Sequence, residues 1–317
     1  MMVESEKHPL APEQDIAPSG SPLDDTLRNT RRVDLHCHTT FSNERIKYLP
    51  GINFHPLLTP TQTYDLARAR GMDFVTITDH DTIDGCLDLL ERRGPLPDFV
   101  IGEEVSVAFP EDGTIVHVNV YDIDEAQHNE LQRLRGSIYD VADFCRKQGK
   151  LYVLNHMTWT AQHRVLKTWQ IEAMLEHFDV FEGINGTRSY AHNAFAWAAT
   201  RGHDKTLVGG SDSHTNRVGT TFTLTEGATV SEMLAAIHAG KASACGAFGT
   251  AEKLSEDVWL VLQGELERRL EETHSFWKRA FTRSVCKVMR WGGPLVCLSY
   301  NKRQNALVRK FNEALPA

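Results

Sequence analysis

The sequence predicts an α/β protein whose body is a distorted (β/α) barrel, with an open doubly wound sheet as the alternative. Between residues 31 and 249, apolar runs of strand length alternate with segments of helical periodicity. Strands that are separated by whole helices pair in parallel through crossover connections, and such units build barrels or open sheets. Beyond Gly249 only helical periodicity remains, so we expect a helical C-terminal extension.

Three segments are expected along the chain. Residues 1–30 are rich in Pro, Ser, Asp and Glu with little periodic apolar content, which predicts a disordered leader. Residues 31–250 form the barrel and residues 251–317 the extension. The extension is basic, because residues 273–317 hold nine lysines and arginines against one acidic residue, while the whole chain has a formal net charge of −8.

The elements of the body follow from periodicity and from the residues at their boundaries. Thr59-Pro60 begins a helix and Gly71 ends it, since proline suits a first turn and glycine a C-cap. Glu111-Asp112-Gly113 has the composition of a hairpin turn. We expect strands at 33–37, 73–78, 99–107, 114–120, 151–154, 180–184 and 206–208. We expect helices at 61–70, 82–92, 125–148, 168–177, 191–200 and 230–239, followed by 257–274 and 275–291 in the extension.

The first strand carries a histidine pair in the run Val33-Asp34-Leu35-His36-Cys37-His38. Successive side chains of a strand point to opposite faces, so His36 and His38 project together and Cys37 projects away from them. Two imidazoles on a rigid strand suit a divalent metal ion, because little rotamer freedom is lost on binding.

The later strands also deliver histidine or carboxylate side chains. In (β/α) barrels the catalytic groups lie at the C-terminal ends of the strands. The candidates are Asp79-His80-Asp81, Glu103-Glu104, His117, Asn155-His156 and Ser211-Asp212-Ser213-His214. Imidazole and carboxylate ligands without thiolate suit Zn, Mn or Fe at a hydrolytic centre.

Five motifs in this order resemble the polymerase-and-histidinol-phosphatase (PHP) family. They are D-L-H-C-H-T, I-T-D-H-D, G-E-E-V-S, V-L-N-H and G-G-S-D-S-H, and the resemblance covers roughly residues 31–249. It implies a distorted seven-stranded (β/α) barrel with a site for two to three divalent metal ions. Most members of this family act on phosphate esters.

The resemblance also implies a role for each motif residue. His36, His38 and Asp212 would hold one metal ion, and Glu104, rather than Glu103, would bridge two ions. The second ion would be held by His117 and His156, and a third by His80 and His214.

The chain departs from the family pattern after the first motif. Many members carry Asp after Ser, where this chain has Ser42-Asn43-Glu44, followed by an unusual insertion at about 45–58. Asparagine is a poor metal ligand. Either Glu44 or the inserted His55 replaces the missing ligand, or the third metal site is weak.

Substrate phosphate needs cationic partners beyond the metal ions. Arg164, Arg188 and Arg217 follow predicted strands on the expected rim, and an arginine fork matches phosphate oxygens. Asn185 and Ser211 are further candidates there. Glu104 would order the metal pair, and Asp81 or His214 would assist proton transfer to the leaving group.

Composition sets limits on location and partners. No apolar run approaches the roughly 18 residues of a membrane span. The six cysteines are scattered without a Cys-x-x-Cys pair, which fits a reducing compartment, so we expect a cytoplasmic protein. An apolar stripe between Phe276 and Met289 lies beside lysines and arginines. It predicts packing on the chain's own domain or a homo-oligomer; peripheral membrane contact or nucleic-acid binding is the alternative.

The expected function is metal-dependent hydrolysis of a phosphate ester by a metal-activated hydroxide. A small phosphomonoester such as a nucleotide, sugar phosphate or phospho-amino acid is favoured, because the body is acidic and has no obvious basic groove. The alternatives are a nuclease that acts on RNA or DNA phosphodiesters and a non-catalytic metal-binding module.

Overall fold

The computed structural model describes residues 30–42, 44–45, 53–272, 277, 280, 284, 295, 298–299, 302–303 and 305–312. The predicted leader and most of the apolar stripe at 276–289 therefore lie outside the described residues. Within these residues no helix is both long and apolar enough to cross a membrane.

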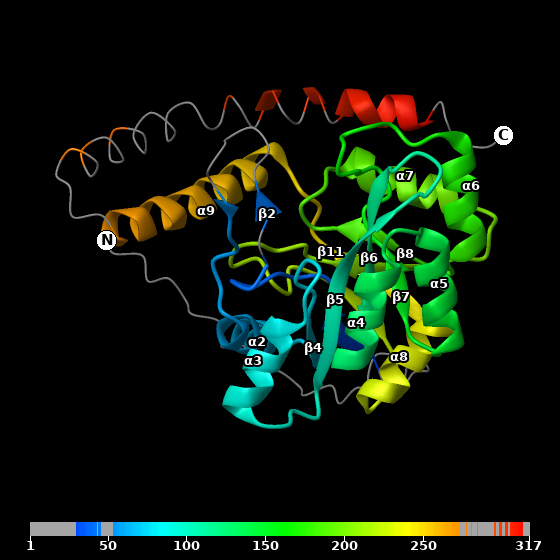
Figure 1. Cartoon of the computed structure of the whole chain (residues 1–317), viewed down its shortest axis with the longest axis horizontal. Coiled ribbons are helices and arrows are strands. Elements are labelled where there is room, and N and C mark those ends of the chain that lie inside the picture. Colours follow the sequence, from blue (N-terminus) through cyan, green and yellow to red (C-terminus); the bar gives the residue numbers. More distant parts are fainter. Residues whose placement is uncertain are drawn as a thin grey trace, which may run out of the picture.

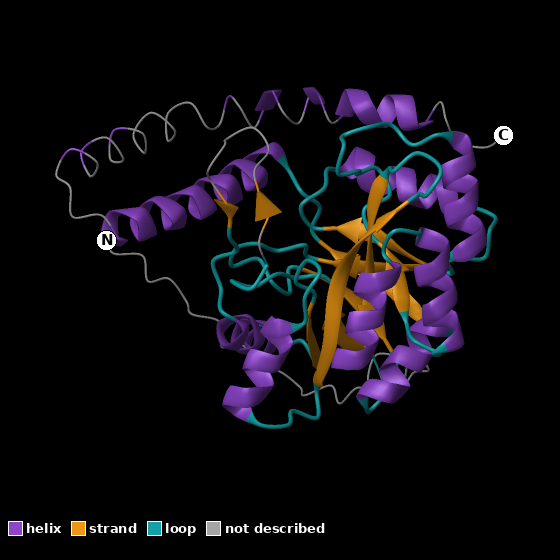
Figure 2. Cartoon of the chain, viewed as in Figure 1, coloured by secondary structure: helices purple, strands orange, loops and turns teal. Residues whose placement is uncertain are grey.

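The described strands of the body form one nine-stranded sheet with the order β11-β10-β1-β4-β5-β6-β7-β8-β9. Figure 2 shows these strands at the centre of the molecule with helices around them. The two ends of the sheet approach each other, since a Cβ added to Gly209 in β9 would lie 3.3 Å from Cys245 N in β11. Asp212 N beyond β9 also donates to His36 O beyond β1 at 2.7 Å. The sheet is thus a nearly closed barrel, which confirms the predicted fold class. The strands are β1 (Arg31–Asp34), β4 (Phe74–Ile77), β5 (Phe99–Ala108), β6 (Ile115–Tyr121), β7 (Tyr152–Leu154), β8 (Val180–Asn185), β9 (Thr206–Gly210), β10 (Thr221–Thr225) and β11 (Ala242–Gly246).

Two glycines at the end of β9 allow the barrel to close. A Cβ on Gly209 would lie 2.6 Å from the carbonyl oxygen of Phe222 in β10. A Cβ on Gly210 would overlap the Cβ of His36 and lie 3.0 Å from its backbone nitrogen. Only glycine permits this approach, and it brings the segment after β9 beside the histidine pair after β1.

The pairing of the strands differs from the expectation in two ways. β5 and β6 form the antiparallel hairpin that the sequence predicted, but β6 also pairs antiparallel with β7, although a helical segment connects them. Gly113 turns this hairpin with a φ of +70°. β10 and β11 were not predicted, and they pair antiparallel on the edge beside β1. The other strands, β1 and β4 to β9, follow one another in chain order.

The helices of the body match the predicted positions except in one place. The single helix expected at 125–148 is two helices, α4 (Glu125–Leu134) and α5 (Ile138–Lys147). Ser137 starts the second one, because its hydroxyl accepts a hydrogen bond from Asp140 N at 3.2 Å. The remaining helices are α2 (Pro60–Ala69), α3 (Asp84–Arg93), α6 (Thr168–His177), α7 (Tyr190–Thr200), α8 (Val230–His238) and α9 (Ala251–Glu272). In the extension, the first helix begins at Ala251 rather than at the predicted residue 257, and most of the helix expected at 275–291 lies outside the described residues.

The extension packs back onto the body. Figure 1 shows α9 beside β2 (Glu44–Arg45), a short strand of the insertion that pairs with β3 (Asn53–Phe54). Further along the chain, Val308 and Phe311 are buried in the main hydrophobic core. The ring of Phe311 lies 5.5 Å from that of Phe195 in α7.

Candidate metal centre

A buried cluster of histidine and carboxylate side chains lies at one end of the barrel. Six members follow the carboxyl ends of β1, β4, β7 and β9, as barrel geometry requires, and the other two, Glu104 and His117, lie within β5 and β6. The members are His36, His38, His80, Glu104, His117, His156, Asp212 and His214, all of them predicted from the sequence as metal ligands. The structure therefore brings these residues together, and their ligation of metal stays a prediction.

Glu104 lies at the centre of the cluster. Its Oε2 atom is 3.2 Å from His36 Nε2, 3.3 Å from His38 Nε2 and 3.1 Å from His80 Nδ1. The other oxygen faces a second group of imidazoles. Oε1 lies 3.0 Å from His117 Nδ1 and 3.2 Å from His156 Nε2. One carboxylate thus has each oxygen directed at a separate set of histidines, which is the arrangement of a bridging ligand.

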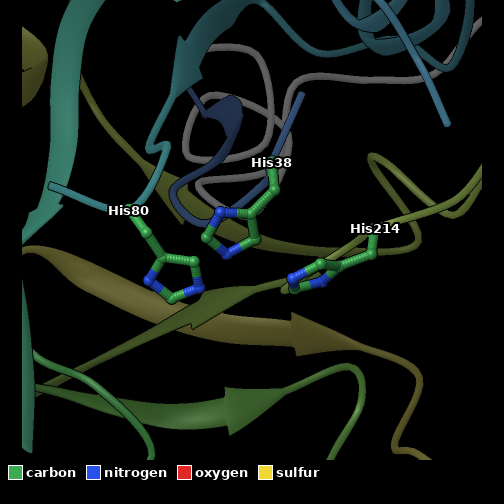
Figure 3. A group of neighbouring side chains, drawn as sticks. All are labelled: His38, His80 and His214. Atoms are coloured by element: carbon green, nitrogen blue, oxygen red, sulfur yellow. The ribbon is translucent and has the colours of Figure 1, made fainter. Parts of the chain in front are cut away.

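A further group of imidazoles shares His38 and His80 with the first set and adds His214. Figure 3 shows His38, His80 and His214 with their rings turned toward one another. The ring centroid of His38 is 4.6 Å from that of His80 and 4.4 Å from that of His214. A ligand nitrogen of each residue lies within 4.8 Å of the other two, a spacing that one metal ion can span.

The buried polar atoms of the cluster fit metal ions. His36 Nε2, His38 Nε2 and Glu104 Oε2 are buried and have no hydrogen-bond partner in the described part of the chain. Buried polar atoms in proteins are normally paired, and leaving them unpaired is costly. Imidazole nitrogens and carboxylate oxygens that converge in this way fit divalent cations.

The charges of the cluster stabilise one another in the absence of metal. Burial by itself would lower the pKa of His36, but the carboxylates of Glu104, Asp212 and Glu182 outweigh it and hold this pKa well above its usual value. Burial would likewise raise the pKa of Glu104, but the neighbouring imidazoles, His36 foremost, hold it well below its usual range. Protons on the histidines therefore compete with any metal ion for the same nitrogens.

A carboxylate that sequence reasoning missed holds two of these histidines in place. Glu182 in β8 is buried, and its Oε1 atom lies 2.9 Å from His36 Nδ1. Its Oε2 atom accepts a hydrogen bond from His156 N at 2.9 Å. Carboxylates commonly orient metal-binding histidines in this way. The available signal was an acidic residue in the middle of an otherwise apolar strand.

Asn185 was predicted to bind substrate, but the structure assigns its amide to the cluster itself. Asn185 Nδ2 donates to Glu182 Oε2 at 2.8 Å and to Asp212 Oδ2 at 3.1 Å. Asn185 Oδ1 accepts from Thr187 N at 2.9 Å. Thr187 Oγ1 also donates to Asp212 Oδ2, at 2.9 Å. Asn185 is fully buried and fixes carboxylates, and its contact with substrate stays a prediction.

The three candidate arginines differ in their surroundings. Arg188 reaches the cluster, with Nη2 4.0 Å from Asp212 Oδ2, and its buried Nε has no hydrogen-bond partner among the described residues. Arg217 is held by carboxylates of α9, with Nε 2.8 Å from Asp257 Oδ1. Arg164 is exposed, and no contact among the described residues joins its guanidinium to the cluster. Arg188 is therefore the arginine that the structure places at the site.

Asp81 was predicted to assist proton transfer, but its carboxylate is engaged elsewhere. Asp81 Oδ1 accepts from Ser106 N at 2.7 Å, and Oδ2 lies 2.8 Å from Arg135 Nη1. The proposed replacements for the missing third ligand gain no support. The side chain of Glu44 lies outside the described residues, and His55 joins no metal-like group within them.

His192, which sequence reasoning did not single out, is buried beside the cluster. Its Nδ1 atom is hydrogen-bonded to Thr158 Oγ1. Burial, followed by the charge of Arg188, lowers the pKa of His192 to about 3, so the imidazole is neutral. The indole of Trp159 lies 4.2 Å from the ring of His117 and packs against the two histidines, His117 and His156, that face Glu104 Oε1.

Comparison with known proteins supports the fold. A two-domain protein from Bacteroides vulgatus ATCC 8482, described as containing a predicted PHP-like metal-dependent phosphoesterase, has a TM-score of 0.51 and 19% identity over 75% of this chain and 69% of its own. PsfC from Pseudomonas syringae PB-5123 has a TM-score of 0.53 and 18% identity over 76% of this chain and 98% of its own. An amidohydrolase from Chromobacterium violaceum reaches a TM-score of only 0.46, at 19% identity over 59% of this chain and 89% of its own.

No protein-family model matches the sequence, and no curated protein matches it. Identities below one fifth show a common fold and nothing finer. The resemblance that the five motifs carry is confirmed at this level: the chain has the barrel fold of PHP-like metal-dependent phosphoesterases.

Proposed function

We propose that this chain is a phosphoesterase of the PHP family that hydrolyses a small phosphomonoester with two to three bound divalent ions, Zn, Mn or Fe. The observation that carries this proposal is the position of Glu104. Both oxygens of one fully buried carboxylate face separate sets of imidazoles, at 3.0–3.3 Å. Glu104 Oε2, His36 Nε2 and His38 Nε2 have no hydrogen-bond partner among the described residues, whereas a purely structural network would satisfy such atoms with hydrogen bonds.

The chain's own residues prepare the site for this chemistry. Divalent ions held by the cluster would activate water at neutral pH and offset the charge that develops on the phosphoryl oxygens. Glu182 fixes the ring of His36, and Asn185 with Thr187 fixes the carboxylate of Asp212. The ligands are therefore oriented before substrate arrives, which reduces the reorganisation needed during the reaction.

The preference for a monoester rests on Arg188 and on the insertion at about 45–58. A monoester carries about two negative charges at neutral pH, since the second phosphate pKa is about 6. Arg188 offers a guanidinium at the cluster, 18% exposed, and its buried Nε has no hydrogen-bond partner in the part of the chain that the structure describes. The end of the insertion lies against the segments that carry the cluster, because Leu57 N donates to His214 O at 3.0 Å and Leu58 O accepts from Thr40 N at 2.9 Å. A cation beside the cluster suits a compact dianion better than a polymer.

A substrate comparison tests this function. The full-length protein, loaded separately with Mn, Fe or Zn, is assayed against nucleoside monophosphates, sugar phosphates, phospho-amino acids and single-stranded oligonucleotides. We expect phosphate release from at least one monoester class and slower cleavage of oligonucleotides. Cleavage of RNA or DNA with all monoesters untouched would instead identify a nuclease. Metal binding without hydrolysis of any ester would support a non-catalytic module.

A further inference from the structure

The segment that carries Asp212 and His214, residues 211–219, is fixed at both ends by one buried carboxylate. Asp34 Oδ1 accepts a hydrogen bond from Ser211 N at 2.8 Å, and Asp34 Oδ2 accepts from Gly219 N at 2.7 Å. Asp34 lies at the end of β1, so the ends of the segment belong to the barrel. The middle of the segment is supported by other parts of the chain.

The middle of the segment is held by a carboxylate of the extension. Asp257 Oδ1 in α9 accepts from Thr215 Oγ1 at 2.8 Å and from Arg217 Nε at 2.8 Å, and Oδ2 accepts from Nε at 2.9 Å. The side chain of Asp257 is 15% exposed. Its neighbour Glu256 is 67% exposed and contacts only the outer Nη2 of Arg217, at 2.7 Å. The two carboxylates are adjacent, but only Asp257 reaches the residue after His214.

The same helix supports the segment by a second route. The backbone N of Leu57, in the insertion, donates to the carbonyl oxygen of His214 at 3.0 Å. Leu57 in turn lies against α9, where a Cβ added to Gly264 would be 2.7 Å from Leu57 Cδ2. α9 thus contacts both the residue that follows His214 and the residue that binds its carbonyl.

We propose that Asp257 is a positioning residue of the metal centre, which holds residues 211–219 so that His214 faces His38 and His80. Ordering a free segment costs conformational entropy, so a contact that orders the segment before metal binding strengthens binding. α9 is then part of the third metal site, although it lies outside the barrel. The proposal rests on the metal-binding part of the proposed function and does not depend on the substrate.

Metal titration of full-length variants tests this role. Asp257→Ala removes both contacts, while Asp257→Asn keeps an acceptor for Thr215 and loses the charge opposite Arg217. Glu256→Gln is the matched control. Each protein is stripped with chelator and titrated with Co²⁺, followed by its visible absorption, and bound metal is counted by elemental analysis. We expect the affinity of the weakest-held ion to fall by about tenfold in Asp257→Ala and less in Asp257→Asn. The tighter ions and the control should match the original protein.

Two results would overturn the proposal. The first is a folded Asp257→Ala protein that binds every ion as the original does. The second is parallel loss of all ions, which would indicate a general structural role. If Asp257→Ala does not fold, Thr215→Val decides, because it removes one hydroxyl donor and keeps the side-chain shape; unchanged affinity for the weakest-held ion then refutes the proposal. A shifted Co²⁺ titration in a protein that hydrolyses no ester would retain the positioning role and reject the proposed activity.

Discussion

Glu103 and Glu104 are neighbours on β5, and both side chains are fully buried, yet their environments differ completely. Glu104 faces the inside of the barrel, where imidazoles outweigh burial and hold its pKa well below the usual range. Glu103 faces outward, where Oε2 lies 2.7 Å from His128 Nδ1 and burial raises its pKa. Alternation along one strand therefore decides whether a buried carboxylate joins the cluster or packs beneath a helix. Burial alone does not mark a site; the groups that surround the carboxylate do.

The largest effect should separate these two residues. Glu104→Gln removes the charge shared by both groups of histidines, so we expect loss of bound metal and at least about a 100-fold loss of activity. Glu103→Gln should keep the metal content, because its side chain contacts none of the cluster. Elemental analysis with steady-state assays measures both. An essential Glu103 together with a dispensable Glu104 would show that the site has been assigned to the wrong face.

Gly210 and Gly136 provide a second comparison, between a glycine at a close contact and a glycine with open space around it. Gly210→Ala would drive a Cβ into His36, and overpacking of this kind costs about 1–3 kcal/mol. Gly136→Ala is the control, since a Cβ there has no neighbour within 4 Å among the described residues. Thermal and urea unfolding should show a clear loss of stability for Gly210→Ala alone. Equal stability of the two variants would mean that β9 and β1 do not approach as closely as described.

Arg188 and Arg164 provide a third comparison, between an arginine at the cluster and an exposed arginine away from it. Arg188→Ala should raise KM by about tenfold, the effect of losing one hydrogen bond to a charged group. Arg164→Ala should leave KM close to that of the original protein, because Arg164 is exposed and away from the cluster. Initial rates over a range of monoester concentrations distinguish them. A larger effect from Arg164 would move the phosphate site to the segment after β7.

The smallest expected effect is the release of a proton from His36 when metal binds. In the metal-free protein the raised pKa of His36 keeps its proton at neutral pH, so metal binding should release it. Calorimetry of metal binding in buffers of different ionisation enthalpy measures this release, which should amount to about one proton from His36. The stability that protonated His36 contributes is fully present below its unfolded pKa of about 6.5 and is lost as pH rises through the higher folded value. Metal binding that is independent of both buffer and pH would contradict this.

The sequence by itself was enough to predict the residues that converge inside the barrel. His36 and His38 are predictable because strand alternation and position after a strand are local properties, and Glu104 was preferred to Glu103 from the resemblance of its motif to the PHP family. The hairpin at Gly113 is readable from local properties too. The break between α4 and α5 was also local, but the capping signal of Ser137 was outweighed by the continuous helical periodicity around it.

Only the tertiary structure decided which residues support the ligands. Glu182 meets His36 across 146 positions of sequence, and Asp257 meets Thr215 from a helix outside the motifs. The tertiary structure also distinguished Arg188, which reaches Asp212, from Arg217, which is paired with Asp257 of α9. These contacts depend on how the sheet closes into a barrel and on where the extension packs against it. Both are set by the packing of side chains far apart in the chain, which no local pattern records.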